Sequence, residues 1–117
     1  MELELVNLTS PAEVRTFERG RFEVYRIGGA TVGLATYDPG WRWSVHVGAG
    51  LGERWCRVAH VGLVLSGAAA VLMEDGTEIV MRARDLFSVP PGHDSWVVGE
   101  EPYVSLHILG GEEYAAR

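Results

Sequence analysis

The stretch of sequence that decides the fold covers residues 68–92 and reads AAAVLMEDGTEIVMRARDLFSVPPG. Its apolar runs are short, and they are separated by Asp75-Gly76 and ended by Pro90-Pro91-Gly92. An Asp-Gly pair between two such runs favours a tight β-hairpin, and a Pro-Pro-Gly run favours a turn. This stretch therefore predicts short strands joined by tight turns.

The same pattern continues on both sides of this stretch, where further glycines and prolines separate runs rich in Val, Leu, Ile, Thr and aromatic residues. Such punctuation is typical of many short strands. Eight or nine of them are too many for one flat sheet, so a sandwich or a barrel that buries one core is expected. The expected strands are 21–27, 31–37, 41–47, 55–66, 68–73, 77–82, 86–89, 95–98 and 103–109.

Composition limits the functions that the chain can have. Its 117 residues, 47% of them hydrophobic, suit one domain with a single core. The formal charge is −6, and no basic cluster is present, which argues against nucleic-acid and anionic-membrane binding. All ten basic residues are arginine, so Schiff-base and P-loop chemistry, which need a lysine amine, are excluded.

The cysteine count and the apolar runs predict a soluble cytoplasmic protein. Cys56 is the single cysteine, so no disulfide can form within the chain, and a reducing compartment suits it. Residues 1–8 carry acids and no basic segment, unlike a signal peptide. The longest apolar run, 58–73, contains His60 and Ser66 and is too short to span a membrane.

The ends of the chain are expected to lie outside the barrel. Ser10, Pro11 and Glu13 fit a helix cap, a first helical position and a capping box, which predicts a short helical turn over 10–15. We therefore expect an N-terminal extension over 1–20 with this turn, a barrel over 21–110, and a tail over 111–117.

Two segments resemble the conserved motifs of the cupin superfamily. Residues 64–67, Val-Leu-Ser-Gly, match the end of the first motif, and residues 84–92, RDLFSVPPG, match most of the second motif, with Arg84 in place of its glycine. The resemblance covers about 31–109, with the Asp75-Gly76 hairpin between the motifs. It implies a double-stranded β-helix or jelly-roll barrel, a homodimer, and a metal centre inside the barrel.

The first motif can be aligned in two registers. In one, His46 takes the first histidine position and Glu53 the glutamate position, but the closing glycine is then missing. In the other, Cys56 takes the second histidine position, His60 takes the glutamate position, and Gly67 closes the motif without an insertion. The second register is preferred for that reason.

The resemblance therefore implies a rearranged metal-ligand set. In the second motif Ser95 occupies the usual histidine position, and His93 lies two residues earlier. Imidazole and thiolate suit Zn²⁺, Fe²⁺, Ni²⁺ or copper, so a divalent transition metal is the expected cofactor. If the set binds metal, its side chains must converge to about 2.0–2.3 Å from a common point. The expected ligands are His46, Cys56, His60 and His93.

Structural roles remain open for several of these residues. A lone histidine in an apolar run, such as His60, is often a hydrogen-bonded core residue, and a free cysteine is often an inert buried thiol. His46 faces the pocket only if the polar side of 41–47 points inward. By the same alternation His107 is expected at the surface or rim.

Three further residues are expected in a substrate pocket. Trp43 and Trp96 would line it, and Arg54 would pair with a substrate carboxylate. If the polar side of 41–47 points inward, a partner subunit would cover Trp41 and Trp43 on its other side. A metal-binding barrel that holds a small polar organic molecule follows, with oxygenase, isomerase or lyase chemistry. The alternative is a binding or sensor barrel without catalytic metal, since one fold serves many chemistries.

Overall fold

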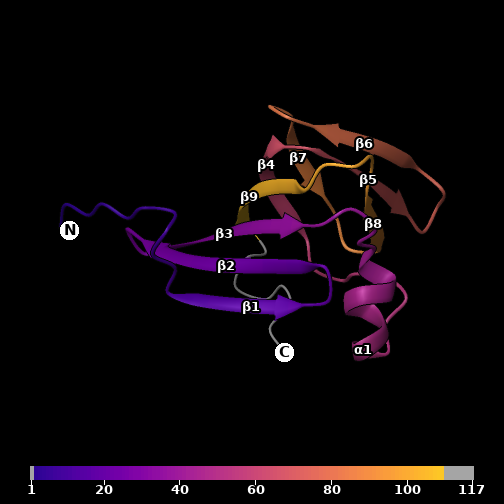
Figure 1. Ribbon diagram of the computed structural model, residues 1–117, viewed down its shortest axis with the longest axis horizontal. Helices are drawn as coiled ribbons and strands as arrows, with labels where there is room; N and C mark the ends of the chain where they lie inside the picture. The colour runs from indigo at the N-terminus through magenta and orange to yellow at the C-terminus, as the bar shows by residue number, and fades with distance from the viewer. Residues whose placement is uncertain (1, 110–117) are drawn as a thin grey trace.

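Two antiparallel sheets face each other in the computed structural model, which describes residues 2–109 (Figure 1). The larger sheet has six strands in the order β1-β2-β3-β9-β4-β7, and the smaller has three in the order β6-β5-β8. The strands are β1 (Glu13–Phe17), β2 (Gly20–Ile27), β3 (Ala30–Tyr37), β4 (His60–Ser66), β5 (Ala68–Met73), β6 (Glu78–Arg82), β7 (Leu86–Val89), β8 (His93–Val97) and β9 (Tyr103–Leu109). This arrangement confirms the expected all-β, jelly-roll-like fold.

The hairpin that the sequence predicts at Asp75-Gly76 joins β5 to β6. Gly76 has a φ of 92°, in the left-handed region that glycine tolerates, and its amide donates to the carbonyl of Met73. The amide of Met73 donates to Thr77 across the turn, which sets the register that pairs Leu72 with Glu78. The local turn signal therefore fixes the pairing of these two strands.

The expected helical turn over 10–15 is wrong, because Glu13–Phe17 form strand β1 at the edge of the larger sheet. β1 pairs with β2 from Glu13 opposite Val24 to Phe17 opposite Gly20. The β-branched side chains of this segment suit a strand, and the ladder satisfies every second backbone group. These gains outweigh a capping box that would support only one or two turns of helix.

The expected strand over 41–47 is also wrong. A π-helical turn, η1 (Ser44–Gly48), is followed by a short α1 (Ala49–Leu51). A Cβ at Gly48 would lie 2.4 Å from the carbonyl oxygen of Glu53, so the glycine permits this close turn. The strand expected from residue 55 begins at His60, and Cys56 makes an isolated bridge. No helix within residues 2–109 is long and apolar enough to cross a membrane.

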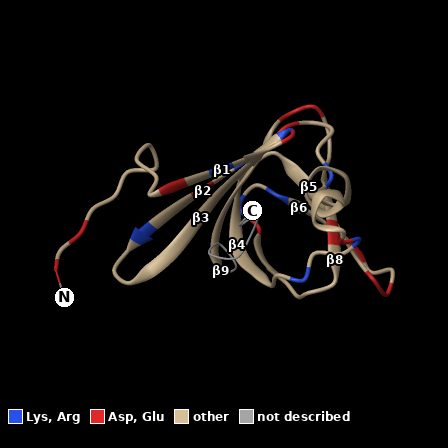
Figure 2. Ribbon diagram, turned by 90° about the horizontal axis from the view of Figure 1, so that it is seen from below, with Lys and Arg blue, Asp and Glu red and all other residues tan. Residues whose placement is uncertain are grey.

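The core lies between the two sheets. Trp41 and Trp43 are 1% and 3% exposed within this single chain, so the expectation that a partner subunit covers these tryptophans is wrong. In Figure 2 the charged residues lie mainly in loops and outer strands, and the central strands β3, β4 and β9 carry none. The largest connected cluster of buried hydrophobic side chains consists of Phe22, Val24, Ala35, Tyr37, Trp41, Trp43, Cys56, Val64, Ala69, Val71, Met81, Phe87, Val89, Val97 and Tyr103.

Candidate metal centre and interior cavity

Three of the four sequence-predicted ligands lie together inside the barrel. Cys56 comes from the loop before β4, His60 is the first residue of β4, and His93 is the first residue of β8. All three are buried, and their ligand atoms lie within 4.8 Å of one another. Sγ of Cys56 is 3.8 Å from Nε2 of His60. The resulting group of one sulfur and two imidazoles has the size and chemistry of a metal site.

Backbone pairing holds Cys56 against His93. The amide of Cys56 donates to the carbonyl of His93 at 2.7 Å, and the amide of Gly92 donates to the carbonyl of Cys56 at 2.8 Å. Gly92 has a φ of 93°, which lets the chain turn sharply after the two prolines and enter β8. The Pro-Pro-Gly turn therefore sets where both side chains enter the barrel.

The ring of His93 is oriented by a second hydrogen bond. Its Nδ1 lies 2.8 Å from the carbonyl oxygen of Pro90, and because a carbonyl can only accept, Nδ1 carries the proton. Nε2 then keeps its lone pair. Metal-binding histidines commonly use a carbonyl in this way to fix the tautomer.

Burial sets the charges of the three groups. It lowers the pKa of His60 to about 2, helped by the neighbouring His107 and His93, so this ring is neutral. Burial also lowers the pKa of His93, although the bond to Pro90 opposes it. Burial raises the pKa of the Cys56 thiol to about 11. The histidines are thus in their ligating form, whereas the thiol must lose its proton to bind a metal.

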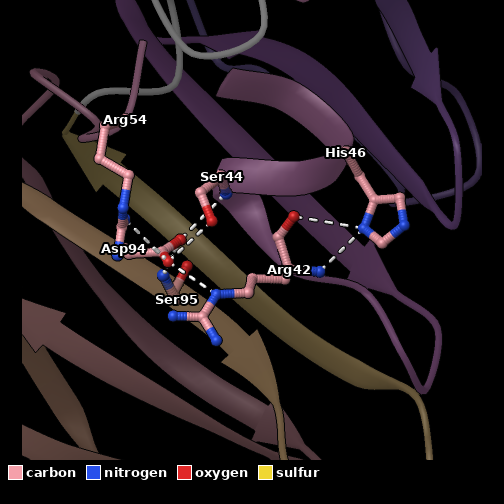
Figure 3. Close-up of polar contacts among 6 residues, drawn as sticks. All are labelled: Arg42, Ser44, His46, Arg54, Asp94 and Ser95. Atoms are coloured by element: carbon pink, nitrogen blue, oxygen red, sulfur yellow. Dashed lines mark hydrogen bonds and ion pairs between the residues drawn. The ribbon is translucent and has the colours of Figure 1, made fainter. Parts of the chain in front are cut away.

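The buried carboxylate of Asp94 forms hydrogen bonds with several segments around the centre. The Asp94 side chain is fully buried and accepts from Nε of Arg42 at 2.8 Å, from the amide and hydroxyl of Ser44 at 3.0 and 2.9 Å, and from Arg54 at 3.1 Å (Figure 3). Burial alone would raise the pKa of Asp94, but the bonds from Arg42 and Ser44 hold it below its usual value. Asp94 thereby links η1 to β8, directly beside His93.

His46 does not join this centre. Its ring lies on η1, where Nδ1 accepts from the amide of Arg42 at 2.9 Å (Figure 3). Its Nε2 is 3.8 Å from a carboxylate oxygen of Glu18. Among the described residues, the group of converging ligand atoms consists of Cys56, His60 and His93 and does not include His46. The π-helical turn that replaced the expected strand is the reason, since a helix directs its side chains differently from a strand.

A cavity of about 40 Å³ adjoins the centre between the two sheets. Trp43 lines it, and the described lining includes neither Arg54 nor Trp96. Instead, the Arg54 guanidinium lies 4.1 Å from the ring centroid of Trp55, and that of Arg42 lies 4.5 Å from the ring centroid of Trp96. The lining residues are Tyr37, Trp41, Trp43, His60, Ala69, Val71, Met81, Phe87, Val89, His93, Ser95, Tyr103 and His107.

Sequence reasoning misplaced His107, which is buried in the cavity wall rather than at the rim. Its ring centroid lies 5.2 Å from that of His60, and its Nε2 lies 2.8 Å from the hydroxyl of Ser105. Burial lowers its pKa to about 4. The alternation in β9 did separate Tyr103, Ser105 and His107 from the apolar face. The missing signal was that this polar face points inward.

Comparisons with known proteins support the fold alone. No family model and no curated protein matches the chain. A Rhizobium leguminosarum protein of unknown function is similar in structure, with a TM-score of 0.66, 18% identity and coverage of 93% of this chain and 97% of that one. A DUF1255 protein of unknown function from Acinetobacter sp. ADP1 gives a TM-score of 0.60, 15% identity and coverage of 83% and 89%.

A third similar structure is an enzyme with a longer chain. A variant of the oxalate decarboxylase of Bacillus subtilis matches with a TM-score of 0.58 and 23% identity, over 90% of this chain and 28% of the decarboxylase chain. These structures are consistent with a cupin-like fold. Because one fold serves many chemistries, the function must be argued from the site.

Proposed function

We propose that the protein binds one divalent transition metal ion through Cys56, His60 and His93 and holds a small polar organic molecule in the adjacent cavity. The observation that carries the proposal is the convergence of three buried ligand atoms within 4.8 Å: Cys56 and His60 lie four residues apart, and His93 is brought to them from β8.

The donor chemistry fits such an ion. One sulfur and two nitrogens suit Zn²⁺, Fe²⁺, Ni²⁺ or copper better than Mg²⁺ or Ca²⁺, which prefer oxygen. The hydrogen bond from His93 to Pro90 leaves Nε2 as the ligating atom, and the neutral state of His60 requires no proton loss. Three protein ligands would leave a position open for a water or a ligand, as in catalytic zinc sites.

The open position suggests the class of chemistry. A bound ion in such a site can polarise a carbonyl or activate water or dioxygen. Around the ion, apolar side chains of this chain form a wall that limits the access of water. His107 lies next to His60, and its ring is neutral near pH 7. Oxygenase, isomerase or lyase activity is compatible with this arrangement. A sensor that binds its ligand without turnover is the competing function.

Elemental analysis of protein purified without added metal tests the proposal. We expect close to one transition-metal ion per chain in the wild type and in His46→Ala, and strong loss of metal in Cys56→Ser and His60→Ala. His46→Ala is the matched control because it removes a histidine that lies outside the group. Stable, folded wild-type protein without metal would refute the proposal and favour the non-catalytic binding barrel.

A homodimer and a cytoplasmic location are the remaining parts of this proposal. The registers align Leu34, Leu106, Leu63 and Leu86 across the outer face of the larger sheet. Leu86 is 81% exposed, so a second copy that packs on this face through a twofold axis would cover apolar surface. Light scattering should give the mass of a dimer, and Leu86→Glu should give a folded monomer. A monomeric wild type at micromolar concentration would rule out this interface.

A further inference from the structure

Two indole groups and one imidazole in the cavity wall have buried ring nitrogens without a hydrogen-bond partner among the described residues. These atoms are Nε1 of Trp41, Nε1 of Trp43 and Nδ1 of His107. The three residues are 1%, 3% and 7% exposed, and all of them line the cavity. Native folds rarely leave buried polar groups unpaired, so each such group calls for an explanation, such as a bound molecule.

The two unpaired indole nitrogens are hydrogen-bond donors. An indole N–H can only donate, which settles the role of Trp41 and Trp43. In His107 the other ring nitrogen, Nε2, lies 2.8 Å from the hydroxyl of Ser105. When that hydroxyl donates to Nε2, Nδ1 carries the proton and becomes a third donor. A molecule that forms hydrogen bonds with the indole N–H groups of this wall must therefore present acceptor atoms.

The charge and shape of the cavity narrow the ligand further. No Asp, Glu, Lys or Arg is among the lining residues. With a dication and the Cys56 thiolate in place, the centre would carry one net positive charge, which a single negative charge neutralises. The lining also includes the apolar side chains of Val71, Met81 and Phe87, which suit an alkyl group. A cavity of about 40 Å³ admits a molecule of only a few heavy atoms.

We propose that the cavity binds a short-chain monocarboxylate whose oxygens accept hydrogen bonds from the indole N–H groups of Trp41 and Trp43. Its alkyl group packs on the apolar wall. The charge argument rests on the metal centre proposed above, whereas the donors and the apolar wall belong to the chain itself. The ligand class thus deepens the proposed function by naming what the site holds.

Nuclear magnetic resonance of the indole N–H groups tests this proposal with acetate as the probe. The chain has four tryptophans, and single Trp→Phe variants assign their signals. In zinc-loaded protein, the Trp41 and Trp43 signals should move in a saturable way as acetate is added. The Trp55 and Trp96 signals should stay in place, because these rings lie against arginines outside the described lining. Acetamide, similar in size but uncharged, should cause a much smaller change.

Other results of this titration would overturn the proposal. Signals of Trp41 and Trp43 that do not respond to acetate, that respond equally to acetamide, or that move only together with those of Trp55 and Trp96 would each refute it. As a second measurement, Trp43→Phe keeps an aromatic ring but removes one donor to a charged group, so acetate should bind about tenfold more weakly. Trp55→Phe is the matched control and should bind acetate as the wild type does.

The same samples separate this inference from the metal proposal. Bound zinc without an acetate response means that the ligand class is wrong while the metal centre stands. An acetate response at Trp41 and Trp43 in protein that binds no zinc means that the metal proposal fails while the donor wall stands.

Discussion

Replacement of the buried carboxylate in Asp94→Asn should destabilise the protein by about 3 kcal/mol, because breaking a buried, hydrogen-bonded charge pair costs roughly 3–5 kcal/mol. The Asp94 side chain is fully buried and accepts from two arginines and two backbone amides. An asparagine can still accept hydrogen bonds through its one side-chain oxygen. Its NH₂ group, however, would face N–H donors and could not accept from them. Arg42 and Arg54 are 38% and 51% exposed, so water recovers part of their lost interaction, which places the loss at the lower end.

Urea denaturation with fluorescence detection measures this loss. The matched control is Glu74→Gln, which removes an exposed ion pair with Arg57 and should cost less than about 1 kcal/mol. For a domain of this size, 3 kcal/mol corresponds to a fall in Tm of roughly 10–15 °C. A loss in Asp94→Asn no greater than in Glu74→Gln would refute the reasoning that this carboxylate clamps η1 to β8.

Two further predictions concern alkaline stability and packing. Burial raises the pKa of Tyr103 to about 12. Above pH 10 the unfolded state therefore loses this proton first, and the free energy of unfolding falls by about 2–3 kcal/mol up to pH 12. Tyr103→Phe should flatten this decline, and identical pH profiles of stability for the two proteins would contradict the prediction. A Cβ at Gly62 would lie 2.2 Å from the carbonyl oxygen of Leu106, so Gly62→Ala should cost roughly 2–3 kcal/mol in thermal unfolding, whereas Gly50→Ala, with open space, should not.

The parts of the fold that sequence reasoning predicted well have local causes. Asp75-Gly76 specifies its turn within four residues, and β5, β7 and β9 begin and end where the apolar runs do. The helical η1 has a distant cause, because the amide and hydroxyl of Ser44 bond to Asp94, 50 positions later in the chain. No pattern within 41–47 contains that partner.

The residues of the candidate centre likewise fall into those that local sequence predicted and those that depended on the tertiary fold. Motif spacing predicted Cys56, His60 and His93, and the structure brings these three together, although their role as ligands stays a prediction. His46 depended on a strand that does not form. His107 depended on which face of β9 is inside, and alternation separates two faces without saying which one meets a cavity. Only the arrangement of the two sheets decides that.

X-ray absorption spectroscopy of the metal-loaded protein tests the central claim most directly, since it reports the atoms around the ion. For zinc, the proposal predicts one sulfur at about 2.3 Å and two imidazole nitrogens at about 2.0–2.1 Å, with the sulfur lost in Cys56→Ser. A first shell made of oxygen alone, or one unchanged by Cys56→Ser, would contradict it.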